Sequence, residues 1–285
     1  MIKIFKDAFK VSYNNIIIAT PLLLFMLILN VYLIVSKDAV KALPSAILFF
    51  LTLFLMVSAF LAGWFYMVKV AVEHYKNSGI DAVKDSETSF SLMREFPVGI
   101  AEHIKSFLGF TVLYLIVADF AFVSVYYIGL KLIGGIGISL SQFVSATEAP
   151  VAMQAFIQSL TKAQLLKINY WYLLIVCSAQ IFALLTMFWP IELMYFTKNP
   201  VLAFFKSVSR IFTHPKSILL FIFINLLNCV LMLFNYVAMF NPIAYFVMTL
   251  VFFYFIVYVF VLLFLYYEEK IKSNSDSSAD GDGQE

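Results

Sequence analysis

Two carboxylic acids stand where a membrane-spanning chain rarely places them. Asp119 lies in the middle of the apolar run "LIVADFAFVSV", and Glu192 follows Pro190 near the end of another apolar run. An acid at the centre of a membrane helix costs about 2.5–3.5 kcal/mol on insertion scales, so such residues lean towards function. Asp119 is therefore either a proton or cation site on a transport path, or an acid that packs helices together.

Glu192 has a different setting. Pro190 removes a backbone donor and can kink the helix, which would free carbonyl groups near the acid. Glu192 could then form a pocket on the cytoplasmic side with Lys206 or Arg210. The simpler interpretation is an acid at the membrane interface, paired with the basic helix that follows it.

Amide side chains form a polar stripe on a later apolar run. Asn225, Asn228 and Asn235 fall at about 0°, 300° and 280° around a helix with 3.6 residues per turn. With Gln180, these amides either bond between helices, worth about 0.6–2 kcal/mol each, or line a hydrophilic path. The candidate intramembrane polar site comprises Asp119, Glu192, Asn225, Asn228, Asn235 and Gln180.

The other chemistry-bearing residues favour neither catalysis nor metal binding. His74 and His103 each follow a glutamate, but neighbouring helix residues point about 100° apart and do not chelate together. Cys177 and Cys229 fall within apolar runs, where cysteine behaves as a small packing residue. The sequence contains no zinc-protease, phosphate-loop, nucleophile-elbow or dinucleotide motif in a fitting context. We expect no enzymatic activity, no cofactor and no metal.

Six apolar runs must position these residues. Of the 285 residues, 63% are hydrophobic and 13% are charged, whereas soluble chains have about 45–50% and 25%. A bilayer core about 30 Å thick needs roughly 20 helical residues, and continuous apolar runs predict helices. The sequence predicts an all-α integral membrane protein, a six-helix transmembrane bundle in a single domain over 1–272. Its spans are predicted at about 16–36, 43–68, 107–130, 165–197, 218–240 and 243–267.

The distribution of positive charge favours one orientation. With the N-terminus inside, the cytoplasmic side holds 14 Lys and Arg residues and the opposite side holds 5. The positive-inside rule therefore places both termini in the cytoplasm. The first apolar run is longer than a signal-peptide core, which predicts an uncleaved first span. Because the basic residues are spread thinly over loops, we expect the lipid bilayer as partner and no nucleic acid.

A short amphipathic segment precedes the fifth span. Residues 200–213 place apolar side chains on one helical face, and Lys206 and Arg210 on the other. Asn199 and Pro200 suit the start of this helix, and Pro215 suits its end. The pattern predicts a basic helix in the cytoplasmic interface.

The same design recurs at the N-terminus. At an offset of 200, Lys6 and Lys10 align with Lys206 and Arg210, and Asp7 shares their polar face. A weaker third copy covers 94–107, before the third span. The chain is therefore predicted to repeat a unit of one interfacial helix and two spans.

Two segments break this pattern. The segment 131–164 opens with the glycine-rich "GGIGISLS", and Pro150 is expected to begin a further interfacial helix on the outside. The segment 273–285 is polar and acidic, and is predicted to be a disordered cytoplasmic tail.

The stretch "PIELMYFTKNPVLAFFKSVSRIFTHPKSILLFIFI" resembles a group of bacterial six-span membrane proteins. These proteins are related to the membrane domain of some glycerophosphodiester phosphodiesterases and to its uncharacterised relatives. Pro190, Ala203, Lys206 and Ser207 support the match, and the repeated units extend it over most of 1–270. The resemblance implies a protein of the bacterial cytoplasmic membrane. It does not imply phosphodiesterase activity, because the hydrolase domain is not found in this sequence.

These features together predict a non-enzymatic multi-pass membrane protein with a membrane-organising or a partner- or lipid-assisting role. Its partners would be the lipid bilayer and, as an option, membrane or cytoplasmic proteins. The alternative is a small-solute or lipid transporter with a polar intramembrane site around Asp119.

Overall fold

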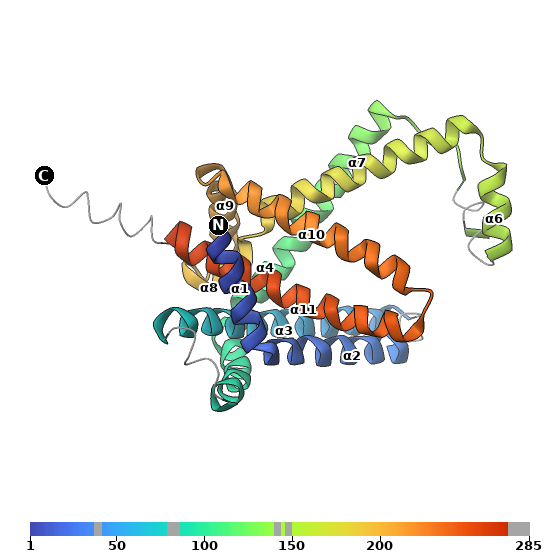
Figure 1. The fold of residues 1–285 in the computed structure, drawn as a ribbon. Coiled ribbons are helices and arrows are strands. Elements are labelled where there is room, and N and C mark those ends of the chain that lie inside the picture. The colour runs from blue at the N-terminus through green and yellow to red at the C-terminus, as the bar shows by residue number, and fades with distance from the viewer. Residues whose placement is uncertain (37–41, 79–85, 140–143, 146–149, 273–285) are drawn as a thin grey trace, which may run out of the picture. The chain divides into compact units, whose positions relative to one another are not determined.

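The computed structural model describes residues 1–36, 42–78, 86–139, 144–145 and 150–272 (Figure 1). The regular structure in this part of the chain is helical. The chain forms two compact units. The first unit comprises Met1–Leu113 with Thr186–Glu285, and the second comprises Tyr114–Leu185. The predicted tail at 273–285 lies outside the described residues.

Six helical stretches are long and apolar enough to cross a membrane, which confirms the predicted all-α membrane fold. Each predicted span overlaps one of them, because bilayer-length apolar runs satisfy their backbone hydrogen bonds internally only as helices. The stretches lie in η1 (Ile16–Ile18) with α2 (Ala19–Val35), α3 (Leu43–Ser78), α4 (Ser86–Leu132), α7 (Lys162–Thr186) followed by α8 (Trp189–Tyr195), α10 (Lys216–Ala238) and α11 (Pro242–Tyr267).

Asparagine–proline pairs begin two of the helices. The Asn199 side chain accepts hydrogen bonds from the backbone N–H groups of Val201 (3.0 Å) and Leu202 (3.3 Å), which starts α9 (Pro200–Thr213). Asn241 caps α11 in the same way. Each cap satisfies two backbone donors that would otherwise lack a helical partner, and proline fits the first turn because it has no N–H to satisfy. The sequence therefore predicted the start of α9 correctly.

Two predicted boundaries differ from the structure. The third copy of the amphipathic unit, 94–107, is not a separate helix but part of the continuous α4, which accommodates Pro97 in its interior. The predicted span 165–197 is divided, since α7 ends at Thr186 and α8 begins at Trp189. The N-terminal helix α1 (Ile2–Asn14) does form a separate short helix, as does α6 (Pro150–Ser159), which begins at the predicted proline.

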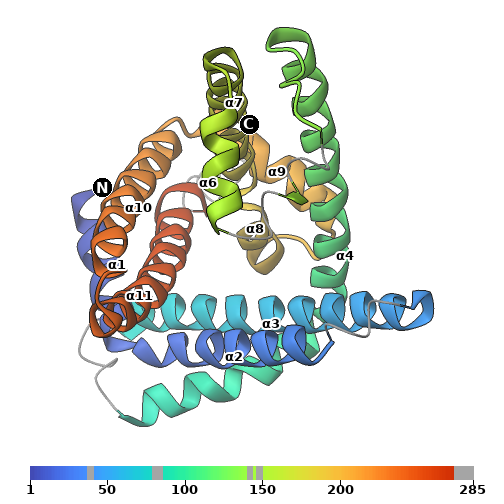
Figure 2. The ribbon, with the colours of Figure 1, turned by 90° about the vertical axis from the view of Figure 1, so that its right-hand side faces the viewer.

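The first unit is packed around the C-terminal half of α11. This helix lies against α1, α2, α3 and α10 (Figures 1 and 2). From Val261 to Tyr267 every residue is buried, and aromatic rings from α3, α4 and the α7–α8 connection pack around this segment. The largest buried side chains there include Trp64, Phe107, Phe188, Trp189, Tyr266 and Tyr267. This end of the unit, rather than its bilayer-exposed helical surfaces, forms the core.

The second unit contains the end of α4 and most of α7. Gly129 allows a close approach, because a Cβ there would lie 2.3 Å from the Trp171 ring. The Trp171 indole N–H donates to the Gly134 carbonyl (3.1 Å), and the Lys167 ammonium donates to the Gly135 carbonyl (2.9 Å). The glycine-rich segment after α4 is therefore attached to α7 by side-chain hydrogen bonds, with Gly134 in the left-handed backbone region.

Candidate functional site

The break between α7 and α8 positions Glu192. Pro190 occupies the first turn of α8, where its missing N–H costs nothing. The Glu192 backbone N–H donates to the Phe188 carbonyl (2.9 Å), and the Trp189 indole N–H donates to the Pro200 carbonyl (2.9 Å). The second bond ties α8 to the start of α9. Glu192 is thereby held in the first turn of a short helix that α9 covers.

Glu192 and Arg210 form an ion pair inside the first unit. The Arg210 Nε lies 3.3 Å from Glu192 Oε1, with the glutamate side chain 0% exposed and the arginine side chain 22% exposed. The second carboxylate oxygen, Oε2, is buried without a hydrogen bond from the described residues. A carboxylate so far from water needs a countercharge, and Arg210 supplies it.

Aromatic rings enclose this pair. The Arg210 guanidinium and the Lys206 ammonium each lie 5.5 Å from the centre of the Phe196 ring. Tyr267 packs on Phe196 and stacks on Tyr195, and its phenol interacts with both charges of the pair. These rings help to exclude water from the Glu192 carboxylate, whereas the Arg210 side chain stays 22% exposed.

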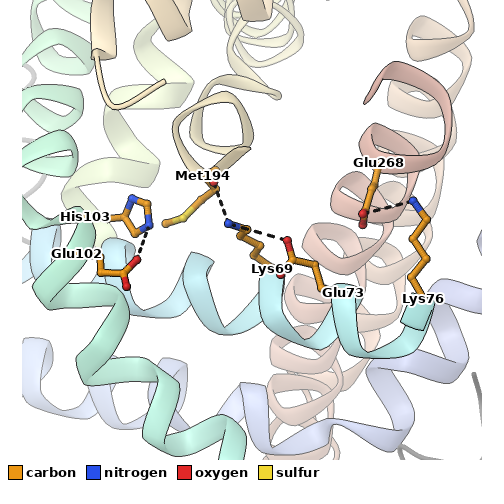
Figure 3. A network of polar contacts seen from close by, with 7 residues as sticks. All are labelled: Lys69, Glu73, Lys76, Glu102, His103, Met194 and Glu268. Carbon is orange, nitrogen blue, oxygen red and sulfur yellow. Dashed lines mark hydrogen bonds and ion pairs between the residues drawn. The ribbon is translucent and has the colours of Figure 1, made fainter. Parts of the chain in front are cut away.

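A second group of charges lies at the same end of the unit (Figure 3). The Lys69 ammonium donates to the Met194 carbonyl (3.2 Å) and lies 3.9 Å from a carboxylate oxygen of Glu73. The Lys76 ammonium lies 3.3 Å from Glu268, whose side chain is 7% exposed. These contacts join α3 to α8 and to the residues after α11. We call the pairs Glu192–Arg210, Lys69–Glu73 and Lys76–Glu268 the polar cap.

The structure shows which sides of the two amphipathic helices pack on the protein. In α9 the buried residues are Ala203, Ser207 and Ile211, whereas Phe212 is 75% exposed. Arg210 turns to Glu192, so the acid pairs with the basic helix that follows it.

In α1, Asp7 is buried rather than on the polar face, and it interacts with Tyr75 of α3. Lys6 and Lys10 of the same helix are exposed, as predicted for their basic face. Both helices therefore bury small side chains, Ala8 and Ser12 in α1 and Ala203 and Ser207 in α9, and α1 in addition buries the acid Asp7.

The remaining predicted site residues fall into different units. Asp119 and Gln180 belong to the second unit, where both side chains are exposed. Asn225, Asn228 and Asn235 belong to the first unit, and all three are partly buried on α10. The Asn225 amide donates to the Phe221 carbonyl of its own helix (3.0 Å) rather than to a neighbouring helix. Of the six residues, Glu192 is the one that the structure places in a buried charged pair.

Lys69, Glu268 and Tyr267 were not predicted as site residues. All three lie at the ends of apolar runs, where charged and phenolic residues normally reach the headgroup region, so nothing in their spacing distinguished them. The described residues contain no group of three or more His, Cys, Asp or Glu side chains that could hold a metal. The polar cap can therefore fix helices by charge pairing, but offers no assembled metal centre in this part of the chain.

Comparisons with protein-family models, with characterised proteins and with solved structures find no match for this chain.

Proposed function

We propose that this chain is a non-enzymatic multi-pass membrane protein that organises the membrane or assists lipids and partner proteins. The supporting observation is a contrast within the first unit between a buried charge that is neutralised and an apolar surface that is exposed. The buried charge of Glu192 is neutralised by Arg210 within the polar cap. In contrast, α2 buries only three of its residues, Ala19, Pro21 and Leu22, and leaves large apolar side chains such as Leu27, Ile34 and Val35 exposed. Such a surface suits contact with lipid or with another membrane helix.

The proposed location is the bacterial cytoplasmic membrane, with both termini in the cytoplasm. Six candidate spans return the chain to the side on which it began. The excess of Lys and Arg on the side of the termini supports the cytoplasm as that side. The resemblance of residues 188–225 to bacterial six-span membrane proteins supports the bacterial cytoplasmic membrane as the location.

Proteoliposomes test the proposed role directly. Spin-labelled phospholipids should show a motionally restricted population that scales with the protein content, and its size should differ between headgroup classes. Proton and small-ion flux should equal that of empty liposomes for the wild type, Glu192→Gln and Asp119→Asn. A steady protein-dependent flux that either substitution abolishes would overturn the proposal.

One observation favours a transporter as the second candidate. The helix break between Thr186 and Trp189 places a buried acid beside interrupted backbone, an arrangement that membrane transporters use at their binding sites. In this candidate Glu192, rather than the exposed Asp119, would be the acid that binds the coupled ion. The same flux measurement separates the two candidates, because only a transporter would lose flux on Glu192→Gln.

A further inference from the structure

The second unit exposes an acid on the side of α4. Asp119 is exposed, and it makes no hydrogen bond or ion pair with the residues that the structure describes. Ile116 and Val123, one helical turn away on either side, are exposed apolar residues, as are Leu115 and Phe120. The second unit therefore presents a carboxylate in the middle of an apolar helical face.

The position of Asp119 along α4 keeps its side chain away from water. The nearest charged residues along the chain are Lys105 and Lys131. At 1.5 Å per residue they lie about 21 Å and about 18 Å from Asp119 along the helix axis, so the acid falls near the middle of a hydrocarbon core about 30 Å thick. An aspartate side chain is too short to reach either headgroup region. Charged or neutral, it needs a hydrogen-bonding partner at its own depth, because lipid tails offer none.

A second polar residue lies at the same depth on α7. Two aromatic ring pairs set the antiparallel register of α4 and α7, and they are Tyr114–Phe182 (5.4 Å between centroids) and Tyr126–Trp171 (6.0 Å). At this register Asp119 and Gln180 differ by only about 3 Å in depth. Gln180 is also exposed. The unit therefore offers a carboxylate and an amide carbonyl, both hydrogen-bond acceptors, at one level.

The natural partner of an exposed carboxylate is a cation, and the sequence carries none at that depth. Every Lys, Arg and His lies outside the six predicted apolar runs, except Lys167 at the start of the fourth. A second copy of the chain could therefore bring amides to Asp119 but no countercharge. Ammonium and guanidinium groups form the strongest hydrogen bonds to a carboxylate. Such a group at the depth of Asp119 must come from a different protein.

We propose that the second unit binds a membrane-spanning helix of another protein, and that a Lys or Arg near the middle of that helix pairs with Asp119. The exposed apolar residues beside Asp119 would pack on the incoming helix. Because opposite charges attract strongly in hydrocarbon, the pair selects partners by the depth of their cation. This inference deepens the partner-assisting role proposed above and rests on it.

Synthetic membrane helices in liposomes test the pairing with two peptides of equal composition. Each is a Leu–Ala helix of about 23 residues with one Lys, which stands at the centre of one peptide and next to the end of the other. Energy transfer from a donor dye on the full-length protein to an acceptor dye on the peptide measures binding. The wild type should bind the central-Lys peptide at least about tenfold more tightly than the end-Lys peptide.

Two variants of the protein locate the effect. Asp119→Asn should bind both peptides equally. Ser124→Ala is the matched control and should keep the preference, because Ser124 lies on the same helix and already donates to the Phe120 carbonyl (2.8 Å). The proposal is wrong if the wild type does not distinguish the two peptides, or if Asp119→Asn still does.

Two further results separate this inference from its alternatives. Energy transfer between separately labelled copies of the protein, abolished by Asp119→Asn, would assign the surface to a second copy and overturn the inference. The flux measurement is independent of peptide binding. Protein-dependent flux would overturn the proposed function while a preference for the central-Lys peptide would stand. Equal binding of the peptides without flux would overturn this inference alone.

Discussion

Replacing Arg210 by glutamine should destabilise the protein by about 2–3 kcal/mol. Removing one partner of a fully buried ion pair costs about 3–5 kcal/mol, because the other charge stays buried and uncompensated. The Glu192 side chain meets this condition at 0% exposure, but the Arg210 side chain is 22% exposed. Solvent near the arginine weakens the pair, so we expect a value below the fully buried range.

Replacing Glu192 should cost less stability than replacing Arg210. After Glu192→Gln, the long Arg210 side chain can turn towards the headgroup region, so we expect a loss of only about 1 kcal/mol. After Arg210→Gln, the carboxylate cannot reach water. The double variant should lie close to Glu192→Gln alone, which gives a coupling energy of about 1.5–2 kcal/mol between the two side chains.

Unfolding in mixed micelles with increasing SDS, followed by tryptophan fluorescence, measures these differences. Trp189 lies one turn before Glu192 and reports on the same region. Lys206→Gln is the matched control, because Lys206 lies over the same Phe196 ring and is also on α9. We expect this control to change stability by no more than about 0.5 kcal/mol. The reasoning fails if Arg210→Gln costs no more than Lys206→Gln, or if Glu192→Gln costs more than Arg210→Gln.

Three further changes test other parts of the first unit. Gly99→Ala should cost about 1–3 kcal/mol in the same unfolding assay, because its Cβ would clash with α3, whereas Gly135→Ala has nothing within 4 Å and should be almost neutral. Asn199→Ala removes the cap of α9 and should cost about 0.5–2 kcal/mol. Burial and the nearby Arg210 charge lower the pKa of His214 below 6.5. A proton therefore binds the unfolded chain more readily, and stability should fall as the pH drops below 6.5. An NMR titration midpoint at or above 6.5 would contradict this.

The membrane fold could be predicted from the sequence because one energetic cost dominates it, that of leaving backbone groups without hydrogen bonds in hydrocarbon. A run of about 20 apolar residues has few alternatives to a spanning helix, since each unsatisfied backbone group in hydrocarbon costs several kcal/mol. The Asn199 cap could be predicted equally well, because it depends on the two adjacent residues Asn199 and Pro200. The helix break near Glu192 was indicated by Pro190, but its consequence, a separate α8, depends on the contacts of Trp189 with the start of α9.

The pairing of charges could be predicted from the sequence only in part. The sequence offered Lys206 and Arg210 as partners for Glu192 and could not choose between them, because the choice depends on the rotation of α9. Lys76 and Glu268 are separated by most of the chain, and no local pattern joins them. Asp7 is a similar case, since its burial follows from the packing of α1 against α3 and α11.

The rotation of α9 shows why polarity alone does not tell which side of an interfacial helix packs on the protein. In water, the apolar face of a helix packs on the protein. Next to a bilayer, lipid accepts that face equally well, and protein contacts select small residues that let the backbones approach. Phe205 and Phe212 accordingly face outwards, while Ala203 and Ser207 pack inwards at a spacing of four residues. Once this stripe faces the protein, Arg210 is carried towards Glu192. The small residues of α9, rather than its basic ones, therefore determine which cation neutralises the buried acid.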